Sequence, residues 1–237
     1  MIQERLIEYE HDGVLLEGFL AYDDAIETSL PGVIVVHAWA GRTNTECDRA
    51  RKLAVEGYVG FACDLYGKGI LGKSVEENSA LMQPFMDGRA MLQSRLAKVL
   101  ETLKTQTEVD ENRIAAIGFC FGGLSVLDMA RTGSDILGVA SFHGLLGAPG
   151  NTAGTEVKAK VLVLHGHEDP MAPVEAVADL QNELTAAGAD WQIHVYGNTM
   201  HAFTNQMAND PSFGTVYSEN ADKRSWQTLL NFLEEIF

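Results

Sequence analysis

One short segment, residues 113–123 (RIAAIGFCFGG), limits the possible folds more than any other part of the chain. Its apolar run ends in glycine, phenylalanine, cysteine, phenylalanine and glycine, a pattern typical of a strand that turns sharply into a helix. Glycines suit such a turn because it combines unusual backbone angles with close approach of neighbouring chain. We therefore predict that Cys120 stands at the apex, where the N-terminus of the helix favours a nucleophilic thiolate. Simple burial of a free cysteine is the alternative that the short motif leaves open.

The order of two later motifs favours the catalytic interpretation. An apolar strand at 161–165 runs into a loop that contains Asp169, and a strand at 191–196 runs into a loop that contains His201. Nucleophile, acid and histidine follow one another in this order in α/β-hydrolases. Both loops fall at the carboxyl ends of predicted parallel strands, where open α/β sheets build their active sites. The sequence therefore predicts a Cys120, Asp169 and His201 triad.

The surrounding pattern alternates strands and helices, which predicts an α/β fold with a mostly parallel open sheet flanked by helices. Two antiparallel edge strands are expected around Asp12-Gly13, a hairpin signal. Pro84 is expected to break a long helical stretch in its first half. A polar stretch after His201 is expected to form a loop over the pocket. The expected strands are 6–10, 14–21, 33–36, 59–63, 113–118, 137–142, 161–164 and 191–195, the helices are 45–56, 75–105, 122–130, 173–187 and 221–236, and the loop is 204–220.

Composition narrows the class of protein. With 237 residues, 46% of them hydrophobic, and no visible linker or repeat, the chain is expected to form a single domain over 1–237. The net charge of −16 argues against nucleic acid or an anionic membrane as a partner. The N-terminal sequence lacks signal-peptide features and no apolar run approaches about 20 residues, which predicts a cytoplasmic protein. Three widely spaced cysteines, Cys47, Cys63 and Cys120, indicate reduced thiols.

The three triad residues have distinct expected roles. His201 would take the thiol proton and return a proton to the leaving group, while Asp169 would hold the ring tautomer and stabilise imidazolium. A thiolate leaves a tetrahedral intermediate more readily than an ordinary alkoxide does. We therefore expect substrates with good leaving groups, such as enol esters and enol lactones, cleaved through a thioester.

A developing oxyanion needs backbone donors. The amide of Phe121, next to the nucleophile, is one expected donor, and Ala38 or Trp39, after the strand 33–36, supplies the other, with Trp39 taken as the donor. Aromatic residues after the motif strands either line the substrate pocket or belong to the core, and both readings stay open; they are Trp39, Phe121, His143 and Phe203.

Three other histidines have simpler structural interpretations than catalysis or metal binding. For His37, a hydrogen bond to backbone is favoured over substrate contact. His165 and His167 point to opposite faces if their strand persists, which is poor geometry for one ion, so no metal site is predicted.

Taken together, the motifs resemble the dienelactone hydrolase family over nearly the whole chain. The stretches that carry the resemblance are 33–41 (VIVVHAWAG), 57–67 (GYVGFACDLYG), 118–123 (GFCFGG), 141–144 (SFHG) and 201–203 (HAF). The resemblance implies an α/β-hydrolase fold without a large cap domain, a small-molecule ester or lactone substrate, and no cofactor. It also implies Cys120 as nucleophile, Asp169 as acid and His201 as base.

The sequence departs from the better-known members of that family at two positions. Ala38 stands where those members carry a glutamate that helps to activate the cysteine, and Asn205 stands where they carry an arginine that contacts a substrate carboxylate. Both positions are expected to border the substrate pocket, and both argue against dienelactone itself as the substrate. Without the glutamate, we hypothesise that Cys120 is ion-paired with His201 at rest. A weakly active or inactive hydrolase-fold protein that binds or senses a small molecule is the competing function, and the oligomeric state, monomer or homodimer, is left open.

Overall fold

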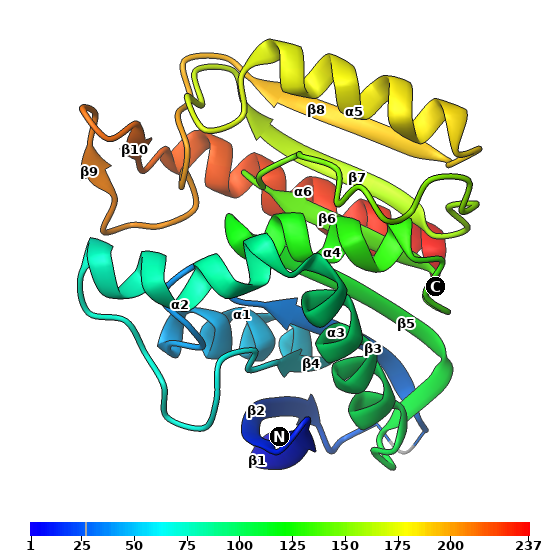
Figure 1. Cartoon of the computed structure of the whole chain (residues 1–237). Helices are drawn as coiled ribbons and strands as arrows, with labels where there is room; N and C mark the ends of the chain where they lie inside the picture. The colour runs from blue at the N-terminus through cyan, green and yellow to red at the C-terminus, as the bar shows by residue number, and fades with distance from the viewer. Residues whose placement is uncertain (27) are drawn as a thin grey trace. The chain divides into compact units, whose positions relative to one another are not determined.

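The computed structural model describes residues 1–26 and 28–237, which form two compact units, Met1–Ile117 and Gly118–Phe237. Each unit contains its own strands and helices, coloured along the chain in Figure 1. Strand β5 (Val109–Phe119) begins in the first unit, and its last two residues belong to the second. Cys120, the candidate nucleophile, directly follows that strand and therefore belongs to the second unit.

The first unit begins with a long antiparallel hairpin. Strands β1 (Ile2–His11) and β2 (Val14–Asp23) pair over their whole length, with Ile2 opposite Asp23 and His11 opposite Val14. The turn between them has positive φ at both central residues, 51° at Asp12 and 74° at Gly13, which matches the twist of paired strands. The Asp-Gly signal therefore predicted this hairpin correctly. The strands are several residues longer than expected.

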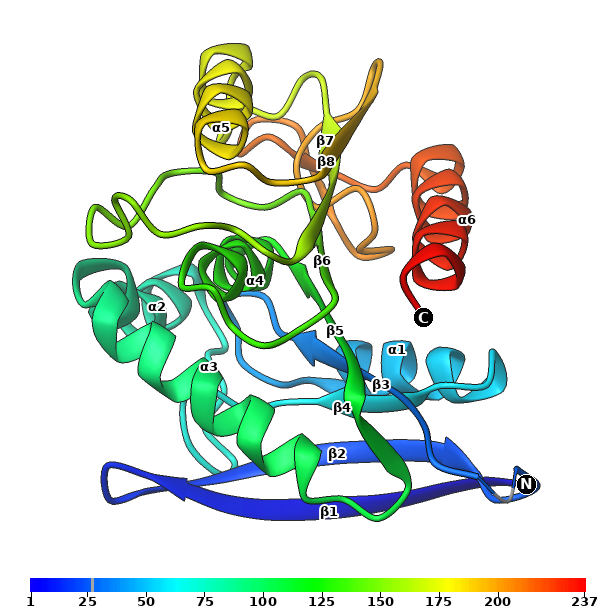
Figure 2. The same ribbon diagram turned by 90° about the vertical axis from the view of Figure 1, so that its right-hand side faces the viewer.

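The rest of the first unit is a parallel arrangement joined to that hairpin. Strand β2 pairs antiparallel with β4 (Val59–Ala62), which pairs parallel with the fully buried β3 (Leu30–Val36). The strand order in this unit is β1, β2, β4, β3 and β5. Helix α1 (Asn44–Val55) starts at a capping box formed by Thr43 and Glu46. Figure 2 shows α1 and α3 (Arg89–Lys104) on opposite faces of these strands.

One expected helix break lies elsewhere. Helix α2 (Val75–Asp87) runs through Pro84, and the predicted break at that proline is therefore wrong. The chain is instead interrupted at Gly88, with φ −113° and ψ 62°, which ends α2 and precedes α3. Pro84 falls in the last turn of α2; it lacks one helical N–H donor, but its carbonyl accepts the Gly88 amide and the turn still closes.

The second unit is a parallel sheet with helices on both faces. Strand β6 pairs with β7 and β7 with β8, all parallel and in register. In Figure 2, helices α4 and α6 lie on opposite faces of these strands. The elements confirm the predicted α/β class; their bounds are β6 (Gly138–Phe142), β7 (Lys160–Gly166), β8 (Trp191–Tyr196), α4 (Phe121–Arg131), α5 (Val174–Ala186) and α6 (Glu219–Ile236).

The segment 204–220 is more ordered than its polar sequence indicated. It contains two short paired strands, β9 (Asn209–Asp210) and β10 (Thr215–Val216). Pro211 and Gly214, read as loop residues, lie in the connection between them. Across the described residues, no helix is both long and apolar enough to cross a membrane.

Candidate active site

Cys120 occupies the strained turn that the sequence predicted. It sits between the end of β5 and the start of α4 with φ 55° and ψ −113°, and its amide donates to the Phe142 carbonyl at 3.0 Å. A β-carbon on Gly118 would lie 2.0 Å from the Gly122 carbonyl oxygen, so only glycine fits there. A cysteine held at positive φ is a strained residue, and such strain is typical of functional sites. The side chain of Cys120 is half-buried, so it is not simply a core thiol.

Asp169 and His201 meet in space. Asp169 follows β7 and is 2% exposed; one carboxylate oxygen accepts the Met171 amide at 2.8 Å, and the other accepts Nδ1–H of His201 at 2.7 Å. The second bond assigns the proton of the imidazole to Nδ1 and leaves Nε2 on the opposite side of the ring. This is the acid and histidine pairing that the order of the motifs predicted.

The backbone of His201 is held by β10. Its amide donates to the Gly214 carbonyl at 3.0 Å, and its carbonyl accepts the Val216 amide at 3.1 Å. Gly214 has φ 81°, and a β-carbon there would lie 2.2 Å from Cγ of Pro170, the residue after Asp169. The loop that carries His201 (the histidine loop) and the loop that carries Asp169 (the aspartate loop) are therefore packed together at Gly214. The sequence marked Gly214 only as a loop residue and gave no sign of this contact.

The charges around His201 favour its protonated form. Burial alone would lower its pKa, but the Cys120 sulfur and the Asp169 carboxylate outweigh burial and raise the pKa from 6.5 to about 10. Within the described part of the chain, its buried Nε2 has no partner that meets full hydrogen-bond geometry. The Cys120 sulfur nevertheless lies close enough to this ring to raise its pKa. Nearby His165 is buried as well, and burial lowers its pKa, so this ring is neutral at neutral pH.

The predicted pocket residues of the second unit differ in their surroundings. Phe203 is fully buried and packs edge-to-face on His143 and on Tyr196, with ring centroids 5.0 and 5.7 Å away. His143 is also buried and packs edge-to-face on His201. Asn205 is exposed, and its side-chain oxygen accepts the Met207 amide at 3.0 Å. Contact of these residues with substrate stays a prediction.

The predicted oxyanion donors lie in different units. Phe121 is the first residue of α4, directly after Cys120, whereas Trp39 and Ala38 follow β3 in the first unit. Their roles stay predictions. The prediction that His37 hydrogen-bonds to backbone is confirmed. Its buried Nδ1 lies 2.7 Å from the Ala38 carbonyl oxygen, and its Nε2 accepts the Leu65 amide at 3.2 Å. Burial lowers the pKa of His37.

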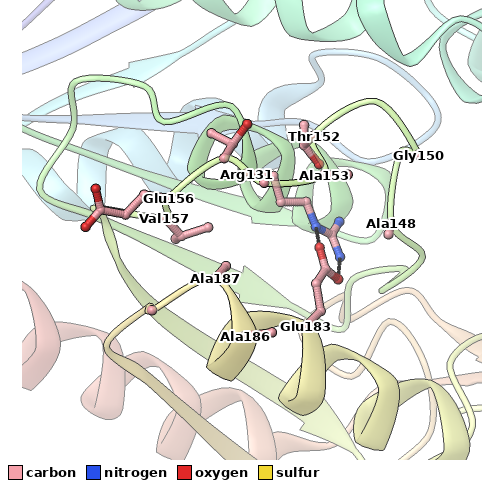
Figure 3. A pocket seen from close by; sticks show the side chains of 13 residues that line it. Arg131, Ala148, Gly150, Thr152, Ala153, Glu156, Val157, Glu183, Ala186 and Ala187 are labelled. Atoms are coloured by element: carbon pink, nitrogen blue, oxygen red, sulfur yellow. Dashed lines mark hydrogen bonds and ion pairs between the residues drawn. The ribbon is translucent and has the colours of Figure 1, made fainter.

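A separate cavity of about 580 Å³ lies in the second unit, and Figure 3 shows the side chains that line it. Small residues such as Ala148, Ala153 and Ala186 form much of its wall, together with Arg131 and Glu183. None of the residues predicted to form the active site lines it.

Arg131 serves the structure of this region. Its guanidinium forms a bidentate pair with Glu183, visible in Figure 3, with both distances 2.8 Å. Its remaining N–H groups donate to the Asp128 carboxylate and to the carbonyls of Leu146 and Gly147. Since all five donors are used, the arginine offers nothing to an anionic ligand. In the described residues, no group of three or more His, Cys, Asp or Glu side chains is arranged to hold a metal ion.

Known proteins share both the sequence pattern and the fold. The sequence model described as "Dienelactone hydrolase family" matches residues 16–237. A solved dienelactone hydrolase-like promiscuous phosphotriesterase from metagenomic libraries is 32% identical, with a TM-score of 0.93 over 100% of this chain and 99% of its own. "Protein usf" of Aquifex pyrophilus is 26% identical over 98% of both chains. The dienelactone hydrolase of Anabaena variabilis is 18% identical and shares the fold, with a TM-score of 0.72 over 100% of this chain and 99% of its own.

Proposed function

The chain belongs to the dienelactone hydrolase family of carboxylic ester hydrolases, and on that premise we propose that it cleaves a small ester or lactone through a cysteine, histidine and aspartate triad. Cys120 is the nucleophile, His201 the base and Asp169 the acid. The observation that carries the proposal is the strained Cys120 turn beside a histidine that Asp169 holds at 2.7 Å. The α/β-hydrolase fold of the matched family supports the same roles.

Acylation begins with the sulfur. We infer that the resting pair is imidazolium and thiolate, because the charges around His201 favour its protonated form and the N-terminus of α4 begins directly after Cys120. Sγ attacks the carbonyl carbon, and the π electrons move to the oxygen, where the amide at the start of α4 and the dipole of this helix stabilise them. When the carbon–oxygen bond breaks, the leaving alkoxide takes the proton from Nε2 of His201. The product is a thioester on Cys120 with a neutral imidazole beside it.

Deacylation reverses the roles. Neutral His201 removes a proton from water, the hydroxide attacks the thioester carbonyl, and the tetrahedral intermediate expels the Cys120 thiolate. The acid product leaves, and imidazolium and thiolate are restored. Asp169 stays ionised throughout, holding Nδ1–H and stabilising the imidazolium.

The two departures from the family pattern bear on the substrate. Ala38 and Asn205 carry no charge, and Asn205 already binds the Met207 amide. We therefore propose neutral esters and lactones with good leaving groups as the substrate class, rather than a carboxylate-bearing lactone. The three free cysteines support a cytoplasmic location.

The test follows acylation and turnover together. Intact-protein mass is measured during incubation with p-nitrophenyl acetate while nitrophenolate release is recorded for wild type, Cys120→Ala and Asp169→Asn. We expect a transient acetyl adduct on the wild type, none on Cys120→Ala, and a kcat reduced on the order of 10³- to 10⁴-fold in Asp169→Asn, since the amide favours the wrong imidazole tautomer. Equal turnover by wild type and Cys120→Ala would contradict the proposal. Saturable ligand binding without an adduct would favour a binding protein.

A second candidate activity is phosphotriester cleavage, favoured by the 32% identity and full coverage with the promiscuous phosphotriesterase. Here the Cys120 sulfur would attack phosphorus, expel the leaving aryloxide or alkoxide and form an S-phosphorylated cysteine, whose P–S bond water then cleaves. Diethyl p-nitrophenyl phosphate tests it in the same assay. Nitrophenolate release that persists in Cys120→Ala would rule this route out.

A further inference from the structure

His143 combines backbone strain with a position beside the candidate base. It directly follows β6, its amide donates to the Leu164 carbonyl of β7 at 2.8 Å, and its φ is 38°. The chain is closely packed at the next residue, Gly144, where a β-carbon would lie 2.2 Å from Oγ of Ser141 and 2.9 Å from the backbone of Gly123. A glycine would adopt the positive φ at lower energy than histidine. The strain therefore points to a use for the imidazole side chain.

The ring of His143 packs against Phe119, at the end of β5, and against His201. Its centroid lies 6.0 Å from the ring of Phe119, the residue before Cys120. It lies 5.1 Å from the imidazole of His201 at an interplanar angle of 67°, and 5.0 Å from the ring of Phe203 at 81°. With only 3% of the residue exposed, the ring fills the space between the nucleophile strand and the histidine loop. Edge-to-face packing of this kind holds rings at defined angles.

A hydrogen bond holds the His143 ring in place. Its Nε2 lies 2.8 Å from Oγ1 of Thr204, a buried side chain three residues after His201. His143 therefore contacts the histidine loop at three places, the ring of His201, the ring of Phe203 and the hydroxyl of Thr204. The loop cannot shift without disturbing a buried hydrogen bond, which proteins rarely leave unmade.

We propose that His143 is a positioning residue for His201, and that its packing and its hydrogen bond with Thr204 keep the His201 imidazole facing Cys120. The proposal rests on the proposed function in that His201 is taken as the base. Asp169 alone does not supply this control, because a single hydrogen bond at Nδ1 still allows the ring to tilt about that bond. The ring of His143 packs against the His201 ring and thereby prevents this tilt.

The test uses three variants chosen for shape. Thr204→Val removes the hydroxyl at nearly constant volume, Thr204→Ser keeps the hydroxyl as the matched control, and His143→Phe keeps a ring without the hydrogen bond. Three readouts are compared: kcat and KM for p-nitrophenyl acetate, the pKa of His201 by NMR of the resting protein, and the pH profile of Cys120 alkylation by iodoacetamide. The last two need no turnover.

For Thr204→Val and His143→Phe we expect kcat to fall about 10- to 100-fold with KM changed less than about threefold, since misplacement of the base affects the reacting geometry more than binding. We also expect the His201 pKa to fall from about 10 toward 6.5, and the alkylation profile to shift with it. Thr204→Ser should restore wild-type behaviour. A folded Thr204→Val or His143→Phe protein with an unchanged His201 pKa and an unchanged alkylation profile would overturn the proposal.

The two proposals fail in different ways. A wild type that forms no acetyl adduct would contradict the ester hydrolase function. The NMR and alkylation readouts would still decide the role of His143, because they report the geometry of the cysteine and histidine pair directly. If His143→Phe does not fold, Thr204→Val decides alone, since it replaces only the hydroxyl oxygen by a methyl group of similar size.

Discussion

Replacement of Gly214 by alanine tests how the site is held together. Gly214 accepts the His201 amide, has φ 81°, and faces Pro170, where a β-carbon would approach Cγ to 2.2 Å. The positive φ alone would destabilise an alanine by about 1 to 2 kcal/mol. Relief of the contact requires a shift of β10 or of the loop after Asp169, and overpacking of this kind costs about 1 to 3 kcal/mol more. We therefore expect a total loss of roughly 2 to 5 kcal/mol.

The matched control is Gly188→Ala. Gly188 has a similar φ of 71°, but nothing lies within 4 Å of the position of its β-carbon, so the variant carries only the backbone penalty. The free energy of unfolding from urea titration should fall by about 1 to 2 kcal/mol, and esterase activity should match wild type.

Activity separates the two variants further. A shift of β10 displaces the backbone of His201, and displacement of a reacting group by about 1 Å costs on the order of 100-fold in rate. Gly214→Ala should therefore lose about 10- to 100-fold in kcat for p-nitrophenyl acetate. If Gly214→Ala matches Gly188→Ala in both stability and kcat, then the contact between Gly214 and Pro170 does not position the histidine, and the reasoning is refuted.

Three further predictions concern stability. His201 has a pKa of about 10 in the folded protein and 6.5 when unfolded, so its contribution to the free energy of unfolding is complete below pH 6.5 and is lost as pH rises toward 10. The difference in free energy of unfolding between wild type and His201→Gln, measured by urea titration, should therefore shrink over that pH range. A constant difference would contradict this prediction. Arg131→Met leaves the fully buried Asp128 carboxylate without its arginine, and it should cost about 3 to 5 kcal/mol, or roughly 6 to 20 °C in Tm. The control, Lys160→Met, breaks an exposed pair with Glu235 and should lower Tm by less than about 4 °C. Similar Tm shifts in the two variants would refute the prediction. We also propose that 1–237 folds as a single domain, since β5 continues through the boundary at Ile117; calorimetry should show one transition, and two separate transitions would oppose it.

Local signals in the sequence predicted most of the fold. The Asp12-Gly13 turn and the glycines around Cys120 each act within a few residues, so the sequence records them directly. The apolar runs behind Asp169 and His201 are just as local. For this reason the order of the motifs sufficed to predict the contact between these two side chains.

Pro84 shows where local reasoning fails. A proline inside a helical pattern normally ends or kinks the helix, yet here α2 continues past Pro84 to Asp87, and Gly88 ends the helix. The outcome depends on which turn the proline occupies, and a few residues of error in a helix boundary reverse the expectation.

The residues packed around His201 and its loop come from distant parts of the chain, and a single sequence does not record such contacts. Thr204 meets His143 across 61 positions, and Gly214 meets Pro170 across the loops that follow β7 and β8. In the sequence, Thr204 and Gly214 belong to a polar stretch with no periodicity, and His143 is one of several aromatic residues after a strand. The contact between Asp169 and His201 is therefore predictable from motifs, whereas the residues packed around it become visible only when the loops are placed in space. If the positioning role of His143 is correct, substitutions at these inconspicuous positions will alter the chemistry of Cys120 without touching a triad side chain.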